Sequence, residues 1–378
     1  MLSFAVHPDG DQLLGGRAMR KKRIDSVSVL IIGTVVLILT MLITISCSKS
    51  NDRAVKSGKR TLYLYNWTYY TPDEVIDRFE KEFNVDVVLD VYASNEDMFT
   101  KLRTSGTIGY DIVVPSADYA SIMIHLDMLH KIDHSKIPNL KHIDPWVTSL
   151  ATYDPNLDYT VPYFLGAAGI AVNTKHVKEY EKDWSIFGNP EFKGKMQLLD
   201  DMVEVLGIAQ KTLGYSVNSR SAEEIAAAGR FINEQWKPNI VKFDSEGFGK
   251  AFARGEFWIS HAFPEVIFEE LPKSRWSDID FFLPENGGPM YLDSMVILKD
   301  APNADIAHEF INFFHRPDIY ALFLDEFYFA PTVNPDAEKY METSPFYRKE
   351  DLEHYELKLD MAEALEIYDS VWQTVRYY

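Results

Sequence analysis

The sequence contains a single cysteine among 378 residues, so a disulfide within one chain and a cysteine-based zinc site are both excluded. Basic residues are also scarce. There are 38 lysines and arginines against 57 aspartates and glutamates, which gives a formal charge of −19 at pH 7. Phosphates demand a basic surface, so a chain this acidic is a poor candidate for binding nucleic acid. It suits cationic partners better.

Common catalytic motifs are missing as well. The sequence has no G-x-S-x-G, G-x-x-x-x-G-K-[ST], G-x-G-x-x-G or H-E-x-x-H pattern. Its ten histidines show no clear metal-binding spacing. The many carboxylates leave a carboxylate-pair hydrolase open, although no spacing argues for one. Together these absences favour a binding protein over an enzyme, and no cofactor or metal is expected.

What the chain does have is the composition of a globular protein. Hydrophobic residues make up 46% and charged residues 25%, which excludes a disordered chain. The length is sufficient for about two domains.

The amino terminus has the parts of a secretory signal. The basic cluster Arg20–Arg23 precedes a nearly apolar run over residues 27–46, and Cys47 follows directly. We predict a signal peptide over residues 1–46, a lipid on Cys47 and a tether over residues 47–60. The alternative is an uncleaved signal-anchor helix, because about twenty apolar residues can span a bilayer. Both interpretations place the rest of the chain outside the cytoplasm.

The acidity belongs to the exported part of the chain. Removal of residues 1–46 takes away five basic and three acidic residues, so the formal charge becomes −21.

Strand and helix patterns alternate after residue 60. Strands are expected over 61–65, 85–89 and 111–114, and helices follow the first two of them. Thr71 and Glu74 form a capping-box pattern, with Pro72 at the first helical position. This alternation predicts a mostly parallel α/β sheet.

The rest of the chain continues in the same style and predicts a second α/β lobe of similar size. Further strands are expected over 195–199, 240–243, 257–260, 279–283 and 290–298, and further helices over 201–213, 221–236, 303–315 and 352–377.

Polar and aromatic residues follow the first and third expected strands. Ligands of open α/β sheets bind beyond the carboxyl ends of strands, so Trp67, Tyr70 and Ser116 are candidates for a cleft. The alternatives are that the two rings pack within their own lobe and that Ser116 caps a helix.

Acidic residues at three further positions could hold a positively charged ligand. Asp201 and Glu204 begin a helix after a strand, where they either cap that helix or hold a cation. Asp293 interrupts an apolar strand, which is costly unless the residue is paired or faces solvent. Phe263 and Glu265 either line a cleft or only begin a helix with Pro264 at its first position.

Several segments, taken in order, resemble the spermidine/putrescine-binding proteins of bacterial polyamine ABC importers. The resemblance covers the chain from about residue 61. The segments that carry it are residues 64–68, 94–96, 110–116, 161–163, 198–201, 293–294 and 311–313.

The resemblance implies a type II periplasmic-binding-protein fold, in which two lobes enclose a ligand cleft and the chain crosses between them at a hinge. The first lobe would comprise residues 61–166 and 291–335, and the second residues 167–290 and 336–378. The protein would be an extracytoplasmic, lipid-anchored monomer. It would capture putrescine or spermidine and deliver it to the membrane permease of an ABC importer.

The resemblance also implies site residues, carried over position by position. These are the aromatic wall Trp67 and Tyr70, the polar contacts Thr68, Ser116 and Ser245, the amine-binding acids Asp201, Glu204 and Asp293, and Phe263 and Tyr291 at usual tryptophan positions. Asp118 replaces a usual tyrosine, Phe329 stands beside Ala330 at another, and Glu265 is a reserve acid. Lys358 replaces a usual glutamine. It would repel a polyamine, so either the alignment is wrong at this position or Lys358 points away.

This set suits a linear polycation. Each buried ammonium needs a carboxylate or water, and aromatic faces attract ammonium groups by roughly 0.5–2 kcal/mol each. Two alternatives stay open. One is a ferric-ion-binding protein, since Tyr69 and Tyr70 form a tyrosine pair. The other is a carboxylate-pair enzyme.

Overall fold

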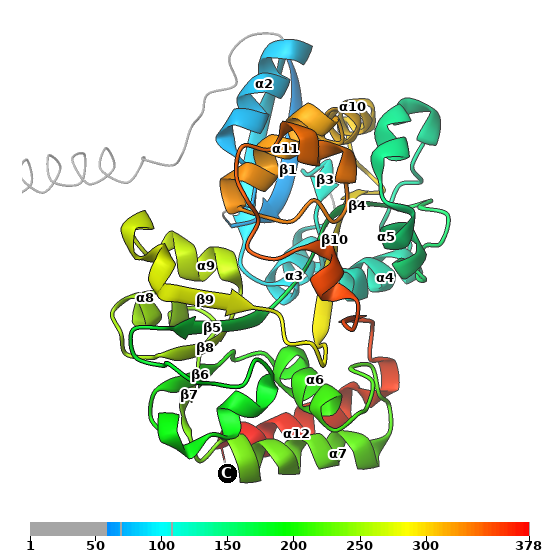
Figure 1. Ribbon diagram of the computed structural model, residues 1–378. Coiled ribbons are helices and arrows are strands. Elements are labelled where there is room, and N and C mark those ends of the chain that lie inside the picture. Colours follow the sequence, from blue (N-terminus) through cyan, green and yellow to red (C-terminus); the bar gives the residue numbers. More distant parts are fainter. Residues whose placement is uncertain (1–58, 69, 107–108, 378) are drawn as a thin grey trace, which may run out of the picture. The chain divides into compact units, whose positions relative to one another are not determined.

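The computed structural model describes residues 59–68, 70–106 and 109–377, which belong to one compact unit, Gly58–Tyr378. The predicted signal peptide, the lipidation site Cys47 and nearly all of the tether lie outside the described residues. Two separate β-sheets organise the described part (Figure 1).

The first sheet has the strand order β11-β10-β3-β1-β2, and β4 pairs with β10 as well. Its strands are β1 (Arg60–Trp67), β2 (Val85–Tyr92), β3 (Ile112–Val113), β4 (Thr160–Ala167), β10 (Pro289–Ile297) and β11 (Glu356–Leu357). The β1 strand pairs in parallel with β2 and β3, whereas β10 runs antiparallel to β3 and β4. The predicted parallel sheet is therefore correct for the first three strands and becomes mixed at β10.

The second sheet has the order β7-β6-β8-β5-β9. Its strands are β5 (Gly169–Asn173), β6 (Met196–Leu198), β7 (Ile240–Phe243), β8 (Ile259–Ala262) and β9 (Ile279–Phe282). The β6 strand pairs in parallel with β7 and β8, and β5 runs antiparallel to β8 and β9.

Helices cover both sheets. Those around the first sheet are α2 (Asp73–Phe83), α3 (Asn95–Ser105), α4 (Ala117–His125), α5 (Pro145–Leu150), α10 (Ala304–Phe314) and α11 (Pro317–Phe327). Those around the second are α6 (Met202–Thr212), α7 (Ala222–Phe231), α8 (Phe248–Ala253), α9 (Pro264–Glu269) and α12 (Leu365–Tyr377). In Figure 1, α6, α7 and α12 lie together beside one edge of the second sheet, and they pack on one another.

Each sheet has its own buried core. Phe79 of α2 packs against Phe310 and Phe313 of α10 on the first sheet, with ring centroids 5.0 and 5.3 Å away. Trp184 and Trp236 are fully buried in the second core. Burying one large apolar side chain stabilises a fold by roughly 1.5–3 kcal/mol, so two cores of this kind can hold their sheets independently.

The chain passes between the sheets at the β4–β5, β9–β10 and β11–α12 connections. The residue bounds of the two lobes stay a prediction. The predicted second lobe, 167–290 and 336–378, contains the start of β10 and all of β11, and both of these pair within the first sheet.

Two local predictions are wrong. The cap of α2 is Pro72, and Thr71 instead accepts a hydrogen bond from Asn66. The helix predicted over 352–377 begins only at Leu365, because the preceding residues include β11, which pairs with β10.

No helix among the described residues is both long enough and apolar enough to cross a membrane.

Candidate functional site

Asp293 lies at a bulge of β10, where the register of pairing with β4 shifts. Its Oδ1 accepts a 2.6 Å hydrogen bond from the hydroxyl of Ser116, and its Oδ2 accepts a 3.0 Å bond from the hydroxyl of Tyr70. The residue is only 4% exposed, so it is not the solvent-facing strand position that the sequence left open. Burial raises the pKa of Asp293 to about 6, although both hydroxyls counteract this shift.

Ser116 stands at the amino end of α4, but its side chain makes no capping hydrogen bond. Its hydroxyl donates to Asp293 and accepts from Asn95 Nδ2 at 3.1 Å. The backbone amide of Ser116 also donates to Asn95 Oδ1 at 3.3 Å. Asn95 therefore orients Ser116 toward the carboxylate, a role that the sequence analysis missed.

Tyr70 is buried in an aromatic cluster of the first lobe. Its ring centroid lies 5.1 Å from Tyr163 and 6.0 Å from Phe329. Phe329 itself stacks on Phe164 at 4.0 Å and is 2% exposed. Phe329 thus packs within the same buried aromatic cluster as Tyr70.

Glu204 supplies charge from the second lobe. Asp201 caps α6 by accepting from the backbone amides of Val203 and Glu204, as the capping interpretation predicts. Glu204 is fully buried, and its Oε1 accepts a 2.7 Å hydrogen bond from Lys358 Nζ. Lys358 does not point away from the predicted site, so that expectation is wrong.

The electrostatics of this pair follow from its burial. Burial raises the pKa of the Glu204 carboxyl, while Lys358 lowers it. Burial lowers the pKa of Lys358, but Glu204 and Asp201 outweigh this effect and raise it, so the lysine stays charged. Asp118, half-buried in the first turn of α4, also has its pKa raised by burial and lowered by Lys358.

Phe263 and Tyr291 form an aromatic contact with ring centroids 5.8 Å apart. The same Tyr291 ring lies 5.9 Å from Lys358 Nζ. Glu265 follows in the first turn of α9, which Pro264 begins as predicted. Burial raises the pKa of Glu265 to about 7, and its Oε2 has no hydrogen-bond partner among the described residues.

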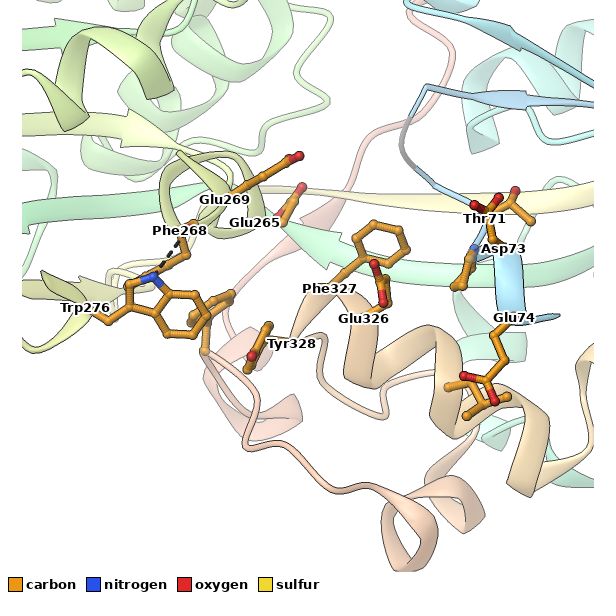
Figure 2. A pocket seen from close by; sticks show the side chains of 13 residues that line it. Thr71, Asp73, Glu74, Glu265, Phe268, Glu269, Trp276, Glu326, Phe327 and Tyr328 are labelled. Carbon is orange, nitrogen blue, oxygen red and sulfur yellow. Dashed lines mark hydrogen bonds between the residues drawn. The ribbon is translucent and has the colours of Figure 1, made fainter. Parts of the chain in front are cut away.

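A cavity of about 430 Å³ opens beside Glu265. Figure 2 shows Glu265 and Glu269 of α9 on one side, with Thr71, Asp73 and Glu74 on the other. Among the described residues, thirteen line the cavity, with five carboxylates, five aromatic residues and no lysine or arginine; the aromatic ones are Phe268, Trp276, Phe327, Tyr328 and Phe346. The cavity therefore presents acidic and aromatic groups to an incoming cation.

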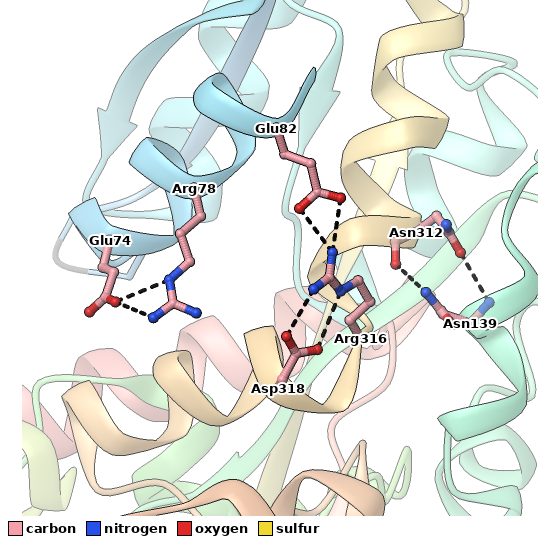
Figure 3. Close-up of polar contacts among 7 residues, drawn as sticks. All are labelled: Glu74, Arg78, Glu82, Asn139, Asn312, Arg316 and Asp318. Atoms are coloured by element: carbon pink, nitrogen blue, oxygen red, sulfur yellow. Dashed lines mark hydrogen bonds and ion pairs between the residues drawn. The ribbon is translucent and has the colours of Figure 1, made fainter. Parts of the chain in front are cut away.

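Arg316 connects α2 and α11, two helices that also carry residues lining this cavity. It donates to both carboxylate oxygens of Glu82 on α2 at 3.0 Å, and to Asp318 on α11 at 2.9 Å (Figure 3). The same two helices carry cavity-lining residues at the start of α2 and the end of α11. The arginine thus links the end of α2 to the start of α11, the ends of these helices that do not line the cavity.

Two predicted site residues donate hydrogen bonds to the backbone, and a third is exposed. The indole of Trp67 donates to the backbone carbonyl of Val114 at 2.9 Å. Thr68 is exposed, and its hydroxyl donates to the backbone carbonyl of Tyr92 at 3.2 Å. Ser245 is exposed in the loop between β7 and α8.

The cavity aromatics Trp276 and Phe346 were also missed by the sequence analysis. Neither follows a strand end, and spacing alone carries no signal for them. Of the tyrosine pair considered as iron ligands, Tyr69 lies outside the described residues and Tyr70 donates to Asp293. Within the ranges that the structure describes, no group of three or more histidine, cysteine or acidic side chains is placed to hold a metal ion.

Comparisons with known proteins agree on one family. The family model for bacterial extracellular solute-binding proteins matches residues 74–352. The spermidine/putrescine-binding periplasmic protein of Escherichia coli is 35% identical over 325 residues, covering 84% of this chain and 91% of the relative.

Solved structures show the same relationship. The Tp0655 (TpPotD) lipoprotein of Treponema pallidum is 50% identical, with a TM-score of 0.82 over 84% of this chain and 100% of that one. A spermidine/putrescine ABC transporter substrate-binding protein, PotD from Streptococcus pneumoniae, is 26% identical, with a TM-score of 0.73 over 84% and 100%. The chain therefore has the periplasmic solute-binding fold and belongs to the spermidine/putrescine-binding proteins among the bacterial extracellular solute-binding proteins.

Proposed function

We propose that this chain captures polyamines such as putrescine and spermidine outside the cytoplasm and delivers them to the permease of an ABC importer. The observation that carries the proposal is the buried carboxylate of Asp293. Both of its oxygens are held by neutral hydroxyls, from Ser116 and Tyr70. A buried carboxylate without a positively charged partner is destabilising, and a ligand cation beside it removes much of this destabilisation.

The surroundings match the rest of a linear amine. Glu265 offers a second, half-buried carboxylate, and the rings of Phe263 and Tyr291 can pack against methylene groups and ammonium faces. The cavity beside Glu265 adds further acidic and aromatic groups that attract such a ligand. Phosphate or carboxylate ligands would be repelled by the same groups.

Ligand contacts from both lobes would favour the closed form. Asp293 belongs to the first sheet, whereas Glu265 follows β8 of the second. A ligand that touches both would therefore stabilise closure by differential binding. The permease then recognises the closed, loaded protein, and the polyamine leaves chemically unchanged.

The first test is calorimetry of the mature chain with putrescine, spermidine, spermine, cadaverine and ferric ion. We expect polyamine binding and an at least tenfold loss of affinity in Asp293→Asn, which keeps the shape of the side chain but removes its charge. Asp305→Asn is the control, because Asp305 pairs with Lys136 on the surface. Unchanged polyamine affinity in a folded Asp293→Asn protein would reject the assigned role of Asp293.

The alternatives predict different results from the same material. Iron-dependent colour without amine affinity would support a ferric-ion-binding protein. Turnover of a polyamine or a glycoside would support an enzyme.

We further propose that cleavage after Ser46 leaves a lipid on Cys47, which keeps the protein at the membrane as a monomer. The neighbouring Treponema pallidum structure is named a lipoprotein, which supports this proposal. When the full chain is expressed in bacteria supplied with a labelled fatty acid, the protein should carry the label, and the Cys47→Ser variant should not. Label on the Cys47→Ser protein would exclude this attachment point.

A further inference from the structure

Lys358 brings a cation of the protein itself into the predicted ligand site. It directly follows β11, and its backbone amide donates to the carbonyl of Met290 at 2.9 Å. The backbone of Lys358 is therefore held by the first sheet. Its side chain reaches across to α6, where Nζ lies 2.7 Å from Oε1 of the fully buried Glu204.

The surroundings of this ammonium are those expected for a ligand amine. Besides Glu204, the carboxylates of Asp201, Asp118 and Asp293 interact with it electrostatically. The ring of Tyr291 lies 5.9 Å away. Carboxylates together with an aromatic face are the groups that recognise a primary ammonium.

The charges can then be assigned. Lys358 already pairs with Glu204, and its charge also acts on Asp201, Asp118 and Asp293. Asp293 and Glu265 form no ion pair among the described residues. Neutral hydroxyls hold Asp293, and Oε2 of Glu265 has no hydrogen-bond partner there. Two carboxylates suit two ligand ammonium groups. A third ammonium would come close to the fixed positive charge and be repelled.

We propose that Lys358 determines ligand specificity by occupying the position of one ligand ammonium, so that the cleft accepts diamines in preference to triamines. This inference rests on the proposed polyamine function and names the ligand class within it. It also explains a positive side chain at a position that should otherwise weaken polyamine binding.

The test compares putrescine with spermidine by calorimetry at pH 7.5 on the mature chain and its variants. The unaltered protein should bind putrescine at least tenfold more tightly than spermidine. In Lys358→Gln, which frees the Glu204 carboxylate for a ligand, the spermidine-to-putrescine affinity ratio should rise at least tenfold. Tenfold corresponds to about 1.4 kcal/mol.

Lys211→Gln is the matched control. Lys211 lies on α6, its side chain is 18% exposed against 19% for Lys358, and it pairs with a glutamate, Glu356, at 2.8 Å. Its replacement should leave the affinity ratio unchanged. A ratio that shifts equally in both variants, or in neither, would overturn the inference.

Loss of Lys358 leaves a buried carboxylate unpaired, so folding is checked by thermal melting. If Lys358→Gln does not fold, the double variant Glu204→Gln with Lys358→Gln replaces it. Removal of the fixed cation should still raise the ratio at least threefold, and an unchanged ratio would reject the proposal. Absence of any polyamine binding by the unaltered protein would instead reject the proposed function, so the two failures are distinguishable.

Discussion

Asp293 and Glu265 are carboxylates that are largely removed from water. Desolvation disfavours their charged forms, and their pKa values are therefore raised. Burial raises the pKa of Asp293 to about 6 and that of Glu265 to about 7. A raised pKa means that the protein favours the neutral form of each acid. A bound ligand ammonium favours the charged form and lowers the pKa again. Polyamine binding is therefore coupled to proton release from these two groups.

This coupling predicts the pH dependence of affinity. At pH 5 both carboxyls are largely protonated, and the ligand must displace their protons; at pH 8 both are ionised. Putrescine affinity should rise across this range, most steeply below pH 6, where both carboxyls still carry a proton, and should level off by pH 8. Calorimetry at pH 6 in buffers of different ionisation enthalpy should show net proton release, which should nearly vanish at pH 8.

Glu265→Gln supplies the control for the assignment. It should remove the part of the profile near pH 7 and leave the part near pH 6, which belongs to Asp293. An affinity that does not change between pH 5 and 8 would contradict the electrostatic account of this site.

The sequence could identify several of these residues but not their partners. Asp293 was recognisable because a charge inside an apolar strand demands an explanation. Its bond to Ser116 joins residues 177 positions apart, which no local pattern encodes. Lys358 was misjudged because repulsion from a ligand was considered without Glu204, which lies 154 positions away in the chain.

At the scale of elements, local patterns predicted most of the helices and strands. The helix over 201–213 and the strand over 290–298 differ from α6 and β10 by one residue at each end. The failure over 352–377 has a physical cause. Hydrogen bonds to β10 hold Glu356 and Lys358 in an extended segment, and this tertiary pairing overrides a helical pattern.

This wrong prediction matters for function because residues 352–377 include the β11–α12 connection, where the chain passes from the first sheet to the second. A helix from residue 352 onward would have carried Lys358 on its surface. The β11 pairing instead fixes its backbone beside Met290, from where the side chain reaches Glu204. The element that the sequence mispredicted is thus the one that places the charge of Lys358 beside Glu204.

At the scale of the whole molecule, the chain has many more acidic residues than the proposed site contains. The mature chain would carry a formal charge of −21, whereas the proposed site involves only a handful of carboxylates. A net negative charge of this size attracts polycations over a distance set by the ionic strength, about 30 Å at 0.01 M salt and about 3 Å at 1 M. The remaining acids can therefore act on the encounter with the ligand rather than on the final complex.

This division of roles predicts how salt changes the kinetics of binding. Between 10 mM and 500 mM sodium chloride, the association rate constant of putrescine should fall several-fold, because screening removes long-range attraction. The dissociation rate constant should change less, because Asp293 and Glu265 are largely removed from water and poorly screened. Stopped-flow tryptophan fluorescence measures both constants. Monoacetylputrescine carries one charge in place of two and should show a weaker salt dependence, whereas equal salt dependence of the two ligands would exclude steering by net charge.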